Sequence, residues 1–179
     1  MDVPSSDKAQ RLRLALPPFD ARARERAADQ EWELSLLDPE DPDERAILIR
    51  LAHPDLDKAI ESGVEEIVVG GEPMNPRLHL AIHEVVATQV IDDDPPEAFA
   101  TLQRLVQSGR DPHEALHMLG SVVSAQLWAT MHERRPYARE EHVQALAALP
   151  GSWDAQFGGA RAPRHVPAGR RARRRRRGR

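Results

Sequence analysis

The sequence contains no cysteine, and it has no apolar run long enough to form a helix across a bilayer. The first absence excludes disulfide scaffolds, thiol nucleophiles and thiolate metal ligands. Any metal would have to be held by histidine, aspartate, glutamate or backbone oxygen, a donor set that suits zinc, iron, nickel or manganese. The second absence excludes a membrane-spanning helix, because crossing the hydrocarbon core takes about 18 to 20 apolar residues.

The first residues also lack the pattern of a secretory signal peptide. Their apolar run is short, is interrupted by Arg11 and Arg13, and is stopped by Pro17-Pro18. A signal peptide instead needs an unbroken apolar region of about 7 to 15 residues. We therefore expect a cytoplasmic protein that has no membrane partner.

The net charge of −4 conceals a division into an acidic body and a basic end. Residues 161–179 hold ten of the 25 basic residues and no acidic one, so residues 1–160 carry 15 basic and 29 acidic residues. The final GRRARRRRRGR predicts weak, salt-dependent contact with nucleic-acid phosphates. It has no aromatic residue for base stacking, so we expect no sequence readout. Contact with the acidic body, a solubilising effect or no role at all would fit the same composition.

The N-terminal part of the chain combines a polar lead with short helical patterns. Residues 1–19 are predicted to be a disordered lead, the segment ahead of the first predicted helix. Helix-start signals predict helices over residues 21–37, from residue 42, and over residues 54–63. VEEIVV at residues 64–69 is rich in β-branched residues, which predicts one strand or half of a hairpin that turns at Gly70-Gly71.

The strongest helical pattern follows this segment. Asn75-Pro76 and Asp111-Pro112 each place an N-cap residue before a proline at the first helical position. Helices are predicted over residues 76–91, 96–107, from 112 to before Pro136, and 137–149. The sequence therefore predicts a mainly α fold: a small helical bundle in one domain over 20–150, with a short strand or hairpin and its core motifs in 72–133. Residues 151–179, rich in glycine, proline, alanine and arginine, are predicted as a disordered basic tail.

Two pairs of histidines stand out within these helices. His79 and His83 form one pair, and His113 and His117 form the other. Residues spaced i, i+4 project from one helix face, which lets two imidazoles share a metal ion. Both pairs fall on the predicted inward face of their helix. On the second helix, that face is predicted to continue through Gly120, Ser124, Leu127 and Met131.

Connectivity predicts that the two pairs meet. Short loops make neighbouring helices antiparallel, so the helix over 76–91 and the one from 112 should run parallel. Both pairs then lie at the same end, with a vertical offset of about 3 Å. Four imidazoles could there hold one divalent metal ion, with zinc as the first candidate and iron as the second. A hydrogen-bonded histidine core and catalytic histidines without a metal are the alternatives.

Residues 113–117 read HEALH, which fits the H-E-x-x-H signature of zinc peptidases. In a metal-dependent hydrolase, Glu114 would act as the general base. Such an enzyme also needs a third ligand, and His132 and Glu133 lie about four turns further along the same helix, too far to supply it. A plainer role for Glu114 is that of an acid in the first turn, where it stabilises the helix dipole. His53 is expected in a loop, with a more distant ligand role left open.

Gly120 lies inside the predicted helix that carries His113 and His117. A glycine inside a helix costs about 1 kcal/mol relative to alanine, so its presence asks for a reason. With Ser121 and Ser124 it forms a strip of small residues just beyond the histidines. Such a strip lets another helix approach closely or leaves room for a ligand, although crowding by Trp128 would be a plainer explanation.

The stretch from EPMNPRLHLAIHEVVATQV to DPHEALHMLGSVVSAQLW resembles a bacterial family described as a domain of unknown function. The resemblance covers roughly residues 72–130 and rests on N-P-x-L-H-x-x-x-H, a D-P-P loop and H-E-A-x-H-x-x-G. Its characteristic residues fall on Asn75, Pro76, His79, His83, Gln89, His113, Glu114, His117 and Gly120. The resemblance implies a helical domain with a recurring histidine set, and it implies no particular activity or metal.

Overall fold

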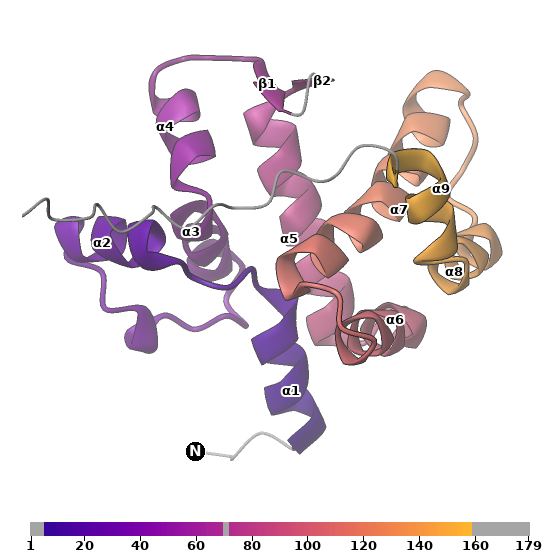
Figure 1. The fold of residues 1–179 in the computed structure, drawn as a ribbon, viewed down its shortest axis with the longest axis horizontal. Coiled ribbons are helices and arrows are strands. Elements are labelled where there is room, and N and C mark those ends of the chain that lie inside the picture. Colours follow the sequence, from indigo (N-terminus) through magenta and orange to yellow (C-terminus); the bar gives the residue numbers. More distant parts are fainter. Residues whose placement is uncertain (1–5, 70–71, 159–179) are drawn as a thin grey trace, which may run out of the picture.

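The computed structural model describes residues 6–69 and 72–158, which fold into helices and one small hairpin (Figure 1). The N-terminal helices are α1 (Ser6–Ala15), α2 (Ala21–Asp29), a 3-10 turn (Leu34–Leu36), α3 (Pro42–Ala52) and α4 (Pro54–Glu61). The hairpin consists of β1 (Ile67–Val69) and β2 (Glu72–Met74), paired antiparallel. The remaining helices are α5 (Pro76–Asp92), α6 (Pro96–Gln107), α7 (Pro112–His132), α8 (Arg139–Ala147) and α9 (Gly151–Phe157). The predicted mainly α fold is thus confirmed.

The helix starts that carry the histidines follow from local sequence. The side chain of Asn75 accepts a hydrogen bond from the Leu78 amide at 3.0 Å, and the following proline opens α5. Asp111 accepts from the amides of His113 and Glu114, both at 3.0 Å, before the proline that opens α7. These caps satisfy amides that have no partner within the helix. The caps fix the first residue of α5 and of α7, and so the position of each histidine pair along its helix.

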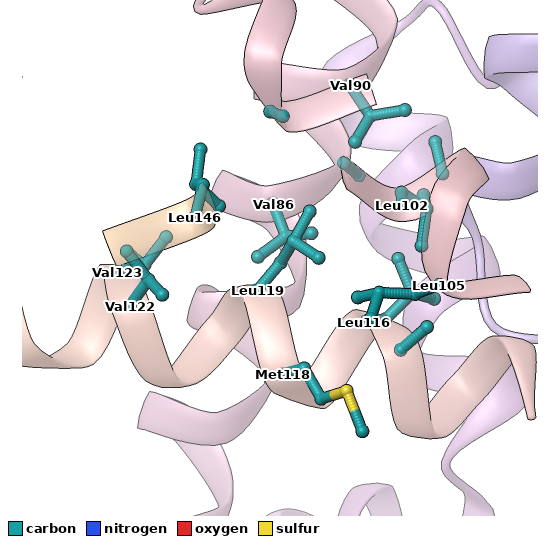
Figure 2. Packing of buried hydrophobic residues seen from close by; sticks show 14 of the residues in the cluster. Val86, Val90, Leu102, Leu105, Leu116, Met118, Leu119, Val122, Val123 and Leu146 are labelled. Atoms are coloured by element: carbon teal, nitrogen blue, oxygen red, sulfur yellow. The ribbon is translucent and has the colours of Figure 1, made fainter. Parts of the chain in front are cut away.

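The main core lies where α5, α6 and α7 pack together, with α1 and α8 against them. Figure 2 shows Val86 of α5 beside Leu119 of α7, with Leu102 and Leu105 of α6 nearby and Leu146 of α8 close to Val123. The labelled side chains of α5, α6 and α8, together with Leu116, Met118 and Leu119 of α7, are less than 2 % exposed. Burying a side chain of this size stabilises a fold by about 1.5–3 kcal/mol. This core holds α5 and α7 in fixed contact.

The helices α3 and α4 form a second layer against α5. Ile49 of α3 is fully buried in the core cluster. The Arg45 guanidinium donates to the Thr88 hydroxyl of α5 at 3.2 Å. Asp57 of α4 is buried and forms ion pairs with Arg26 and Arg50, both at 2.5 Å. The Arg45 contact holds α3 against α5, and the ion pairs of Asp57 join α4 to α2 and α3.

Two predictions for the N-terminal part of the chain differ from the structure. The predicted disordered lead over 1–19 was wrong for residues 6–15, which form α1. Its residues Leu12 and Leu14, with Leu16 just beyond, pack on the core, because burying leucines outweighs the arginines between them. The helix predicted over 21–37 ends at Asp29, since Glu31 adopts a positive φ of 61° that breaks the helix.

Toward the C-terminus, a short helix forms where the predicted disordered tail was expected to begin. Residues 151–157 form α9, in which Trp153 packs against the core. Partial burial of this aromatic ring provides the stabilisation that the surrounding polar and small residues lack. The Arg-rich segment 161–179 lies outside the described residues. Among the residues that the structure describes, no helix is both long and apolar enough to cross a membrane.

Candidate metal centre

Five imidazole rings gather where α5, α7 and the junction of α3 with α4 meet. They belong to His53, His79, His83, His113 and His117, and their contacting pairs have ring centroids 4.4–5.4 Å apart. His53 and His83 are almost fully buried, whereas the other three are half-buried. The structure thus brings the two histidine pairs of the sequence together and adds a fifth histidine.

Four of these residues have the arrangement of a metal-ligand set. His53, His79, His83 and His117 each offer one ring nitrogen, and the four nitrogen atoms lie within 4.8 Å of one another. The group contains imidazoles only. These residues could hold a metal ion.

The sequence predicted that His53, one of these four residues, lies in a loop. It is the residue between α3 and α4, ending one helix and preceding the proline that opens the next. Its Nδ1 lies 2.8 Å from the Ile49 carbonyl oxygen, one turn earlier. A carbonyl oxygen can only accept, so Nδ1 carries the hydrogen and Nε2 keeps a lone pair directed at the cluster. Fixing the tautomer in this way is typical of a metal-ligating histidine.

His113 forms a hydrogen bond within the cluster. Its Nε2 lies 3.0 Å from the Nε2 of His53. Because the His53 Nε2 is the acceptor, the hydrogen on this contact belongs to His113. A similar contact joins the Nε2 atoms of His79 and His83 at 3.2 Å. His113 therefore presents an N–H group to the same space in which the four ligand nitrogens meet.

Gly120 permits the close contact between α5 and α7. A Cβ atom built on Gly120 would lie 2.9 Å from the Cγ2 of Ile82, closer than real Cβ contacts. Within the strip of small residues, Gly120 thus serves a close helix approach next to His83 and His117. Trp128, the alternative reason for the glycine, is 59 % exposed and stacks on His132 instead.

The helices α5 and α7 cross at an angle, whereas the short loops of the chain predicted that these two helices run parallel. In Figure 1, α7 runs obliquely past α5. His83 of α5 contacts both His113 and His117, so both pairs meet at the crossing. The predicted inward face of α7 correspondingly ends early. Beyond Val123, α7 extends past α5, which leaves Ser124, Leu127 and Met131 exposed.

Burial keeps the rings of His53, His79, His83 and His117 neutral. Loss of hydration, together with repulsion from neighbouring histidines, lowers the pKa of His79 to about 4 and the pKa of His117 to about 2. The same two causes depress the pKa of His83 strongly. Burial also lowers the pKa of His53, although the hydrogen bond to Ile49 opposes it. Neutral imidazole is the form that binds a metal ion.

The four nitrogens would have to move closer together to bind one metal ion. In a tetrahedral zinc site two ligand nitrogens are about 3.3–3.4 Å apart, because each zinc–nitrogen bond is about 2.0–2.1 Å. Nitrogens up to 4.8 Å apart would therefore have to approach by as much as about 1.4 Å, which side-chain rotation can provide. The buried Nε2 of His117 has no hydrogen-bond partner among the described residues. A bound metal ion would satisfy that lone pair and draw the rings together.

Glu114, which would be the general base of a hydrolase, forms an ion pair outside the histidine ligand group. Its carboxylate forms an ion pair with Arg110 at 3.6 Å, and the ligand group does not include it. Arg110 in turn forms an ion pair with Asp154 at 2.5 Å. The position in the first turn of α7 also suits an acid, because the helix dipole is positive there. The contacts of Glu114 therefore support its structural role.

Comparison with known proteins gives a family and no described activity. No curated protein and no solved structure matches the chain. The matching family model reaches further than the resemblance over 72–130, because it includes α3, α4 and His53. That model is described as a domain of unknown function, DUF1841; it matches residues 30–148, and the chain therefore belongs to this family.

Proposed function

We propose that this protein binds one divalent metal ion through His53, His79, His83 and His117. The observation that carries the proposal is the convergence of four imidazole nitrogens within 4.8 Å from three segments of the chain. Each ligand is held by an element that is packed into the core, and His53 is further fixed by its bond to Ile49. Such pre-arrangement reduces the conformational entropy lost on binding.

A purely hydrogen-bonded histidine core accounts less well for the same contacts. Five neutral imidazoles have one donor and one acceptor nitrogen each, so they can bond in a closed network only if every ring finds two partners. The His117 Nε2 has none among the described residues. Native proteins seldom leave a buried polar atom unsatisfied. A metal ion uses several of these lone pairs at once.

Zinc is the first candidate for the metal and iron the second. Zinc accepts four nitrogen ligands in tetrahedral geometry, and imidazole suits both metals. When bound, either metal could act as a Lewis acid on an additional ligand. The chain's own histidines would position the metal, and their neutral state at physiological pH would leave their lone pairs available.

Metal analysis of untagged protein tests the proposal. We expect about one equivalent of a transition metal after purification or after titration with zinc. His83→Leu should abolish this uptake, because it removes a central ligand and leaves an apolar side chain in a buried place. His132→Leu is the matched control, since His132 lies on α7 outside the cluster. Wild-type protein that neither contains nor takes up metal would refute the proposal, as would equal uptake by both variants.

A further inference from the structure

A groove lies between α3 and α5, where the hydrogen bond from Arg45 to Thr88 joins the two helices. Its volume is about 410 Å³, within the range of sites that hold small molecules. The polar lining comes from Arg45 of α3 and from Glu84, Thr88 and Gln89 of α5. These residues are distinct from the histidine cluster. The groove is therefore a second candidate site.

Arg45 brings a positive charge to this groove, although the residue is only 8 % exposed. Its Nη1 donates to the carbonyl oxygens of Pro39 and Glu40 at 3.0 and 3.4 Å, and its Nη2 donates to the Thr88 hydroxyl at 3.2 Å. These neutral acceptors hold the guanidinium in place. A guanidinium has five N–H donors and binds a carboxylate best through two of them in parallel. The Thr88 hydroxyl, which accepts from Arg45, can donate its own hydrogen to the same carboxylate.

Glu84 brings the opposite charge to the same groove, one helical turn away from Thr88. Residues spaced i, i+4 are neighbours on one helix face, with Cβ atoms about 5–6 Å apart. The guanidinium of Arg45 is bonded to Thr88, so a cation and a carboxylate lie along one short stretch of the groove. A ligand with only negative charge would be repelled by Glu84, and one with only positive charge by Arg45. A small molecule that carries both charges fits this arrangement best.

The rest of the lining suits the other parts of such a ligand. Pro42, Ala81 and Val85 supply apolar surface, and Val85 is 42 % exposed. The Oε1 of Gln89 is buried and has no hydrogen-bond partner among the described residues. A buried oxygen without a partner indicates a missing donor. An ammonium group next to Glu84 would be that donor once the terminal amide of Gln89 rotates, a torsion that is soft in glutamine.

We propose that this groove binds a free α-amino acid with an apolar side chain. The ligand's carboxylate accepts hydrogen bonds from the Arg45 guanidinium and the Thr88 hydroxyl. Its ammonium group donates to the Glu84 carboxylate, and its side chain lies on Ala81 and Val85. Each charge of the groove then meets its opposite. Binding at this groove does not depend on the proposed metal ion, because the groove and the histidine ligand group share no residue.

Titration of the full chain with L-leucine, followed by NMR of isotope-labelled protein, tests the proposal. We expect saturable shifts that centre on the amides of the groove residues. Two analogues each remove one charged end of the ligand: 4-methylpentanoate lacks the ammonium group, and leucine amide lacks the carboxylate. Each should bind about 10-fold more weakly or worse, because a charge-assisted hydrogen bond is lost. The absence of a saturable shift with leucine, shifts centred elsewhere, or equal affinity for leucine and either analogue would overturn the proposal.

The variant Glu84→Gln tests the ammonium end of the site. It keeps a side chain of the same size, so leucine should bind about 10-fold more weakly, whereas 4-methylpentanoate should bind no more weakly than to wild type. Glu65→Gln is the matched control, because Glu65 is exposed in the connection between α4 and β1, away from the groove residues. Equal leucine affinity in Glu84→Gln and Glu65→Gln would overturn the proposal.

A third variant separates the groove from the proposed metal centre, since amino acids also chelate metal ions. His83→Leu removes a proposed metal ligand and leaves the groove lining intact. Folded His83→Leu protein should therefore bind leucine as tightly as wild type does. Loss of leucine binding in this folded variant would mean that the metal centre holds the leucine, and it would overturn the assignment to the groove.

Discussion

Replacing Gly120 by alanine should destabilise the crossing of α5 and α7 although alanine favours a helix. The new Cβ would lie 2.9 Å from the Ile82 Cγ2. An ordinary carbon contact of about 3.5 Å or more needs a displacement of about 0.6 Å. Ile82 cannot easily rotate away, because a β-branched side chain in a helix is held near one χ1 value. Overpacking costs about 1–3 kcal/mol, and alanine regains about 1 kcal/mol over glycine, so we expect a net loss of up to about 2 kcal/mol.

The displacement should also reach the proposed metal ligands. His83 follows Ile82 directly, and His117 lies one turn before Gly120. Ligand distances tolerate changes of about 0.2 Å, so a shift of several tenths should weaken zinc binding. Changes to groups that support a metal site typically cost about 10- to 100-fold in affinity. Chemical denaturation of the metal-free protein and zinc titration by calorimetry would measure the two effects.

The matched control removes the obstructing methyl group. In an Ile82→Ala background, Gly120→Ala should become stabilising by up to about 1 kcal/mol, because only the helix preference remains. The sign of the effect therefore reverses between the two backgrounds. A Gly120→Ala protein that is more stable than wild type and binds zinc unchanged would refute this account of the helix crossing.

Three further predictions concern stability. Zinc at about 100 times its dissociation constant should stabilise the fold by about 2.7 kcal/mol, which raises Tm by roughly 5–11 °C for a chain of this size; His83→Ala should remove the rise. Metal-free protein should lose stability as pH falls from 6.5 toward 4, because the unfolded chain binds protons more readily than His79, whose pKa is lowered to about 4. The slope per histidine approaches about 1.4 kcal/mol per pH unit in denaturant titrations. Finally, His142→Leu should stabilise the fold by about 1 kcal/mol in thermal melts, because both ring nitrogens are buried without a hydrogen-bond partner among the described residues.

Each of these predictions has a result that contradicts it. An equal zinc-dependent rise in Tm for His83→Ala would place the bound zinc elsewhere. Stability that does not change between pH 6.5 and 4 would mean that the cluster is accessible to protons in the native state. A clear loss of stability in His142→Leu would show that the ring of His142 has a polar partner, such as buried water.

The local part of the site could be predicted from the sequence. The cap-and-proline starts before α5 and α7 fixed the helix phase, so the i, i+4 spacing was enough to place His79 with His83 and His113 with His117. Short loops indicated that the pairs lie near one another. The crossing itself depends on side-chain packing at Gly120, and a glycine in a sequence does not identify its partner.

His53 and α1 could not be predicted for a related reason. His53 stands alone between two helices, and its partner His113 is 60 residues away. No periodicity marks such a residue, because its position depends on how α3 packs against α5. The segment of α1 has arginines among its leucines and ends in prolines, which resembles a polar lead. Only the apolar surface of the core explains why Leu12 and Leu14 fold onto it.

The location of His53 has a consequence for how the protein would acquire the proposed metal ion. A peptide containing only α5 or only α7 would carry a two-histidine site of ordinary weak affinity. The complete set forms only when the α3–α4 junction docks on α5, a contact between distant parts of the chain. Tight metal uptake would therefore report that long-range packing is complete, and a chain that has formed its helices without docking them would release its metal to competing chelators.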